Sequence, residues 1–151
     1  MYGTAHFPQS HFMDLLSQIW LNLCNSSQEK KMNVLVVDDS RAMTFTVHDL
    51  VVHLGHTTTI AHSGNEACVL LRQQKFDVVI TDYQMDDGNG EVVIDAVLRI
   101  EEKKRPACYL HSTSENTVTL MQKHYPAVIC RTKKEHPKKI KAFLLQIAAI
   151  T

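Results

Sequence analysis

The sequence of 151 residues has no CxxC pair, no long uninterrupted apolar run and no excess of either sign of charge. Its four cysteines, Cys24, Cys68, Cys108 and Cys130, are widely spaced, which argues against zinc and redox sites and predicts reduced thiols. Acidic and basic residues balance at 16 each. The bulk charge therefore indicates neither direct nucleic-acid binding nor membrane binding.

The early part of the chain lacks the marks of a targeting or membrane segment. Its most apolar stretch, residues 12–24, is interrupted by Asp14, Gln18 and Asn22, so it is too short and too polar to span a bilayer. It also lacks the basic start and the small-residue cleavage site of a signal peptide. We therefore expect a cytoplasmic protein.

A polar run at residues 25–31 divides the chain into two parts, an N-terminal extension (1–31) and a domain (32–151). Apolar residues in the extension recur at helical spacing and predict a short amphipathic helix: Leu15, Leu16, Ile19, Trp20 and Leu23. We expect this helix to pack on its own domain or to fray rather than to bind a partner, because short isolated helices are marginal in water. Met32 is an alternative natural start.

Short apolar runs and helical patterns alternate strictly from residue 32 onward. We expect strands at 34–37, 57–61, 78–81, 107–111 and 127–130. We expect helices near 43–54, 63–71, 93–100, 115–124 and 137–147. Such alternation requires right-handed crossovers, and continuously apolar strands are typical of a parallel sheet covered on both faces. The prediction is a doubly wound α/β fold.

Carboxylates follow two of the predicted strands, at the sheet edge where such folds bind ligands. Asp38 and Asp39 come after the first strand, and Asp82 follows the third. Asp38 and Asp39 could alone form a solvated turn or a helix N-cap. Three converging carboxylates, however, repel one another unless a cation neutralises them, and oxygen ligands favour Mg²⁺ over zinc.

Two further polar segments follow the predicted fourth and fifth strands, namely residues 111–114 (His-Ser-Thr-Ser) and 131–134 (Arg-Thr-Lys-Lys). They add a hydroxyl and an ammonium to the carboxylates and the metal. Together these groups predict phosphoryl transfer, in which an aspartate attacks phosphorus while the cations neutralise the phosphoryl oxygens. The product would be an aspartyl phosphate.

Residues 34–40 (VLVVDDS) and 77–85 (DVVITDYQM), with Gly90, resemble the receiver domains of two-component response regulators, over about residues 32–150. The resemblance implies a flavodoxin-like sheet of strand order 2-1-3-4-5 and a signalling domain rather than an enzyme. It implies Asp82 as phosphoacceptor, with Mg²⁺ held by Asp38, Asp39, Asp82 and the backbone carbonyl of Gln84. It further implies that Ser112 binds a phosphoryl oxygen and that Lys133 is the site lysine.

Four positions depart from the family pattern. Asp86 replaces a loop proline, and Lys134 replaces the proline after the site lysine, which leaves Lys133 as the choice over Lys134. Counting from Pro106 places His111 at the hydroxyl position, whereas counting from Asp82 places Ser112 there. The aromatic switch position holds Cys130 or Arg131, so an aromatic rotamer switch is not expected.

The resemblance implies a histidine kinase or a histidine phosphotransfer protein as the phosphoryl donor and a downstream protein as the target. We expect a stand-alone regulator that acts through protein contacts. Whether it forms a homodimer is left open by the sequence. The main alternative is a receiver-like docking module that is never phosphorylated. A flavin-binding protein is a weaker alternative, because the first strand is not followed by a phosphate-binding loop. We expect His53 and His56 to be surface residues and the basic residues of 131–141 to form a solvated or partner-facing surface.

Overall fold

The computed structural model describes residues 30–150. The predicted N-terminal helix and Cys24 lie outside the described residues, and the division at residue 31 stays a prediction. No helix within residues 30–150 combines the length and apolarity needed to cross a membrane.

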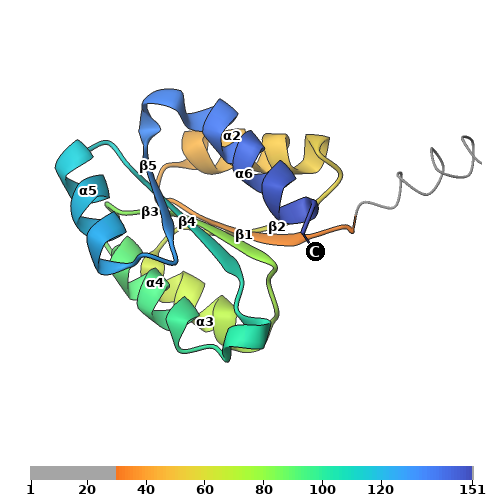
Figure 1. Cartoon of the computed structure of the whole chain (residues 1–151), viewed down its shortest axis with the longest axis horizontal. Coiled ribbons are helices and arrows are strands. Elements are labelled where there is room, and N and C mark those ends of the chain that lie inside the picture. The colour runs from red at the N-terminus through yellow and green to blue at the C-terminus, as the bar shows by residue number, and fades with distance from the viewer. Residues whose placement is uncertain (1–29, 151) are drawn as a thin grey trace, which may run out of the picture. The chain divides into compact units, whose positions relative to one another are not determined.

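Five short strands form one parallel sheet at the centre of the domain (Figure 1). They are β1 (Asn33–Val37), β2 (Thr57–Ala61), β3 (Val78–Asp82), β4 (Ala107–Ser112) and β5 (Ile129–Thr132). Their order is β2-β1-β3-β4-β5, and every neighbouring pair is parallel. The predicted flavodoxin-like topology is confirmed.

Five α-helices connect and follow the strands. They are α2 (Arg41–His53), α3 (Gly64–Gln73), α4 (Gly90–Leu98), α5 (Glu115–His124) and α6 (His136–Ala148). Four of them begin after a capping residue whose side chain accepts a hydrogen bond from the backbone N–H three residues later: Ser40, Ser63, Asn89 and Ser114. These caps satisfy amide groups that the first turn of a helix leaves unpaired, and so they set where each helix starts.

The helices cover both faces of the sheet, with α2 and α6 on one face and α3, α4 and α5 on the other (Figure 1). Alternate residues of each strand point to opposite faces. On β4, Tyr109 packs with Phe143 and Leu144 of α6, whereas Leu110 joins the core on the side of α3, α4 and α5. The sheet therefore has a separate apolar core on each face.

The structure differs from the sequence predictions mainly around β5. This strand begins at Ile129, two residues later than predicted, because Val128 N–H closes a turn onto the carbonyl of Tyr125. A short 3₁₀ helix, η2 (Lys133–Glu135), then links β5 to α6, and a second, η1 (Glu102–Lys104), precedes β4. The shift puts Lys133 directly at the carboxyl end of β5.

Candidate functional site

The carboxyl ends of four strands bring charged side chains together at one edge of the sheet. Asp38 follows β1, Asp82 is the last residue of β3, and Lys133 follows β5. His111 lies directly beside Asp82 in the register of β3 and β4. Residues that are far apart in the sequence thus meet at one rim because the sheet is parallel.

The ammonium of Lys133 lies between two buried carboxylates. Its Nζ is 3.0 Å from Asp38 Oδ2 and 3.1 Å from Asp82 Oδ2. The exposed fractions of the three side chains are 1% for Asp38, 7% for Asp82 and 17% for Lys133. The other two carboxylate oxygens accept backbone hydrogen bonds, from Ser40 N–H at 2.9 Å and from Tyr83 N–H at 2.8 Å. Both carboxylates are therefore oriented by the protein itself.

Burial perturbs the titration of this cluster. Burial raises the pKa of Asp82, against the lowering effect of Lys133 and with a further rise from the charge of Asp38. Burial would lower the pKa of Lys133, but its hydrogen bond to Asp38 and the charges of both aspartates hold that pKa above its ordinary value. Lys133 is therefore a fixed cation at neutral pH. Perturbed pKa values of this kind gather at functional sites.

His111 is the second side chain, after Lys133, that faces the carboxylates. A ring nitrogen of His111 and one oxygen each of Asp38 and Asp82 lie within 4.8 Å of one another, and all three residues are buried. The Nε2 atom is 3.5 Å from Asp38 Oδ2. Burial lowers the pKa of His111 well below its ordinary value, and the charges of the nearby His136 and Lys133 lower it further. The imidazole is therefore neutral at neutral pH.

Ser112 lies next to His111 in the sequence but points to the other face of the sheet. Adjacent residues of a strand alternate between faces, and His111 shares the face of Tyr109. The buried hydroxyl of Ser112 accepts a hydrogen bond from Ser114 N–H at 3.2 Å and so closes the turn into α5. The structure thus brings His111 rather than Ser112 to the carboxylates, as the count from Pro106 indicated.

The remaining predicted metal ligands lie at the exposed side of the rim. Asp39 and Gln84 are both exposed, and Asp39 is not part of the buried cluster. The side-chain Oε1 of Gln84 accepts a hydrogen bond from Thr113 Oγ1 at 3.2 Å. The carboxylate oxygens of Asp38 and Asp82 lie close together, and Asp39 adds an exposed carboxylate next to Asp38 in the sequence. This donor set fits a hard cation such as Mg²⁺.

The backbone of Asp82 is in tight contact with the start of α4. Gly90 N–H donates to the carbonyl of Tyr83 at 2.9 Å. A Cβ atom on Gly90 would come within 2.4 Å of the Asp82 carbonyl oxygen. Only glycine allows this approach, so Gly90 helps to hold Asp82 in place.

Other candidate residues lie away from the site. Lys134 is exposed and pairs with Glu115 of α5 rather than with the carboxylates. Asp86 is exposed in the loop before α4. His53 is exposed as predicted, but the prediction was wrong for His56, which is buried and accepts a hydrogen bond from Met32 N–H at 3.5 Å. That role is structural.

Three of the cysteines, Cys68, Cys108 and Cys130, are free thiols, and Cys130, one of the two candidates for the aromatic switch position, is buried in β5. Arg131 is exposed, and its guanidinium donates to the Cys130 carbonyl at 2.8 Å.

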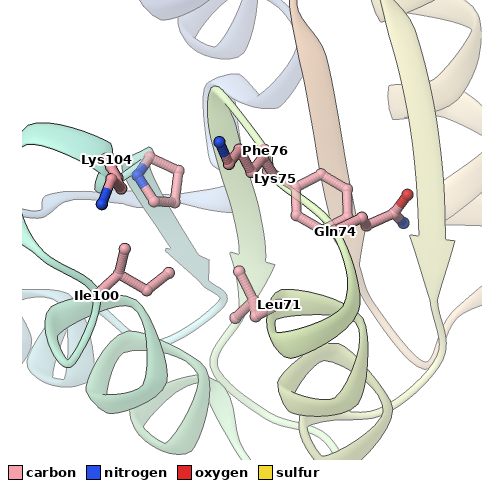
Figure 2. A pocket seen from close by; sticks show the side chains of 7 residues that line it. Leu71, Gln74, Lys75, Phe76, Ile100 and Lys104 are labelled. Carbon is pink, nitrogen blue, oxygen red and sulfur yellow. The ribbon is translucent and has the colours of Figure 1, made fainter.

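A small pocket lies at the opposite end of the sheet (Figure 2). It has a volume of about 190 Å³, and its lining includes Phe76 and Pro106, which precede β3 and β4. Leu71 of α3 and Ile100 close its sides, with the side chains of Lys75 and Lys104 at its edge. This pocket contains no carboxylate, hydroxyl or histidine that could perform chemistry.

Comparisons with known proteins agree with the geometry. The family model of the response regulator receiver domain matches residues 34–144. The chain is 33% identical over 85 residues to the chemotaxis protein CheY of Pseudomonas aeruginosa, which covers 56% of this chain and 68% of that protein. It is 39% identical over 61 residues to a gliding motility regulatory protein of Myxococcus xanthus, which covers 40% of this chain and only 8% of that protein.

The fold is also found in solved structures. The chemotaxis response regulator CheY4 of Vibrio cholerae superimposes with a TM-score of 0.69 over 78% of this chain and 99% of that one, at 24% identity. This likeness concerns the fold alone.

Proposed function

Because this chain belongs to the response regulator receiver domain family, we propose that it is a signalling domain that takes its phosphoryl group on Asp82. The observation that carries the proposal is the buried contact of Lys133 with Asp82 and Asp38. An aspartate that is largely desolvated at the rim of the sheet and already paired with a fixed cation is suited to attack phosphorus.

The reaction needs little from the protein beyond positioning and charge. A carboxylate oxygen of Asp82 forms a bond to phosphorus while the bond from phosphorus to the donor nitrogen breaks, and the donor histidine keeps that electron pair and takes up a proton. Lys133 moves its charge toward the phosphoryl oxygens as the charge of the Asp82 carboxylate is lost. Asp38 keeps the ammonium of Lys133 in the site during this change.

Mg²⁺ held by Asp38, Asp39, Asp82 and the backbone carbonyl of Gln84 would neutralise the phosphoryl oxygens when bound. Of these four ligands, Asp38 would have two roles, because its buried carboxylate also contacts the ammonium of Lys133.

We propose a histidine kinase or a histidine phosphotransfer protein as donor, and a downstream protein as target. A phosphoryl group adds charge at the end of β3, next to β4 and β5, and a change of charge at one rim can alter the surface that a partner contacts. The alternative is a docking module of the same fold that is never phosphorylated. The exposed Asp86 and Lys134, which replace the family's prolines, favour that alternative.

A labelling experiment separates the two. Incubation with acetyl phosphate and Mg²⁺ should add one phosphoryl mass to the intact protein, and Asp82→Asn should abolish the addition because the nucleophile is gone. Asp49→Asn, which changes an exposed aspartate of α2, is the matched control and should label like the parent. A folded parent that never labels, or label that persists in Asp82→Asn, would refute the proposal.

A further inference from the structure

The end of β4 presents an imidazole to Asp82 where a hydroxyl was predicted. His111 is buried, pairs in register with Asp82 and directs Nε2 toward Asp38. The neighbouring hydroxyl of Ser112 is already engaged by Ser114 N–H on the other face of the sheet. The side chain available to a phosphoryl group on Asp82 is therefore that of His111.

The surroundings of the ring decide which nitrogen carries the proton. Nδ1 of His111 is buried and has no hydrogen-bond partner among the described residues, whereas Nε2 faces a carboxylate oxygen at 3.5 Å. A buried N–H without an acceptor is rarer in proteins than a lone pair without a donor. The ring therefore carries a proton on Nε2, which points toward the acid cluster.

His136 holds the ring in that orientation. The two imidazoles are stacked with centroids 4.8 Å apart and planes 22° from parallel. Tyr109 contacts the edge of the His111 ring, at a centroid distance of 6.5 Å. His136 is the first residue of α6 and is itself buried, so the backbone of the η2–α6 junction fixes its place. A ring packed between Asp38 and His136 has little freedom to turn.

We propose that His111 is a catalytic residue whose Nε2–H donates a hydrogen bond to an oxygen of the phosphoryl group on Asp82, and that His136 is the positioning residue for His111. This inference rests on the proposed function. A ring nitrogen of His111 and a carboxylate oxygen of Asp82 lie within 4.8 Å of each other. A phosphoryl oxygen attached to Asp82 can therefore come within hydrogen-bonding distance of the ring. An imidazole is also longer than a hydroxyl side chain, so it can reach the phosphoryl oxygen without movement of β4.

Spectroscopy tests the hydrogen bond directly. The protein is labelled with ¹⁵N-histidine and titrated with beryllofluoride and Mg²⁺, since beryllofluoride mimics a phosphoryl group on a carboxylate. The His111 Nε2–H proton, assigned by its absence in His111→Gln, should move downfield and couple to ¹⁹F. An Nε2–H signal that stays unchanged at saturation would overturn the proposal.

Rates of labelling by acetyl phosphate test the role of each histidine. His111→Ala should label about 100- to 1,000-fold more slowly, the range seen when one preorganised donor is removed from a reaction centre. His111→Gln, which keeps an N–H donor, should recover part of the rate. His136→Ala should slow labelling less than His111→Ala, and His136→Phe, which keeps a stacked ring, should restore it. His124→Ala changes an exposed histidine of α5 and is the control.

The outcomes separate this inference from the proposed function. A parent protein that never labels on Asp82 would remove the proposed function. A parent that labels on Asp82 while His111→Ala labels equally fast, or while Ser112→Ala is the slow variant, would overturn the role of His111 alone. Thermal unfolding of each variant shows that it is folded at the assay temperature, and His111→Gln keeps the test open if His111→Ala does not fold.

Discussion

Lysine–carboxylate pairs occur at both ends of the sheet, in opposite surroundings. At the carboxyl ends of the strands, Lys133 contacts Asp38 and Asp82, which are almost fully buried. Near the amino end of β4, beside the pocket of Figure 2, Lys104 pairs with Glu101, and these side chains are 62% and 59% exposed.

The two sets of ion pairs differ in how much they contribute to the stability of the fold. Exposed ion pairs contribute about 0–1 kcal/mol, because water screens them and their side chains lose freedom. A buried pair loses more hydration, and it is often no more stabilising than apolar residues of the same volume. Stability alone therefore does not explain why Asp38, Lys133 and Asp82 are gathered at the rim. The proposed phosphoryl transfer to Asp82 does explain it.

Removing the half-buried cation of Lys133 should give the largest change in stability. Lys133→Met would leave two buried carboxylates without their counter-ion and should lower the free energy of unfolding by about 3 kcal/mol at neutral pH. Urea unfolding followed by circular dichroism measures the change. Added Mg²⁺ should recover part of it, because a cation bound by the same carboxylates takes over the neutralisation. Lys134→Met, an exposed neighbour, is the control, and a loss below about 1 kcal/mol for Lys133→Met would contradict the comparison.

A smaller effect is expected from the backbone at the same rim. Alanine normally stabilises a helix relative to glycine, but Gly90→Ala would push a methyl group into the Asp82 carbonyl. We expect a net loss of about 2 kcal/mol, since overpacking a tight contact is destabilising. Labelling of Asp82 should slow as well. Val92→Ala on the exposed face of α4 is the comparison, and a stabilised Gly90→Ala protein would show that α4 can move away freely.

The smallest effect is expected at the exposed pair. Glu101→Gln removes the charge that Lys104 contacts and should change the free energy of unfolding by about 0.5 kcal/mol or less, with no change in labelling of Asp82. Unfolding of the parent and of Glu101→Gln in low and in high salt measures the contribution of the pair to stability. The difference between the two proteins should vanish at high salt, because salt screens the charges. A loss as large as that of Lys133→Met would mean that burial does not distinguish the two ends of the sheet.

Much of the rim could be predicted from local patterns. Asp38 and Asp82 each follow a β-branched apolar run, and the ends of parallel strands meet at one edge. A lysine after the fifth run is predicted, the resemblance to receiver domains favours Lys133 over Lys134, and the structure puts Lys133 on the carboxylates. The two-residue error in β5 did not affect this choice, because the predicted lysine follows the strand in either case.

The order of strands and helices, the parallel sheet and the acidic rim were determined by the sequence alone, because apolar runs and capping residues act over a few neighbouring positions. Tertiary structure decided which of two adjacent residues, His111 or Ser112, faces Asp82. A shift of one residue in a strand exchanges the two faces, so the answer depends on the pairing of β4 with β3. The stacking of His136 on His111 also needed the structure, since it joins residues 25 positions apart (136 − 111) across two elements.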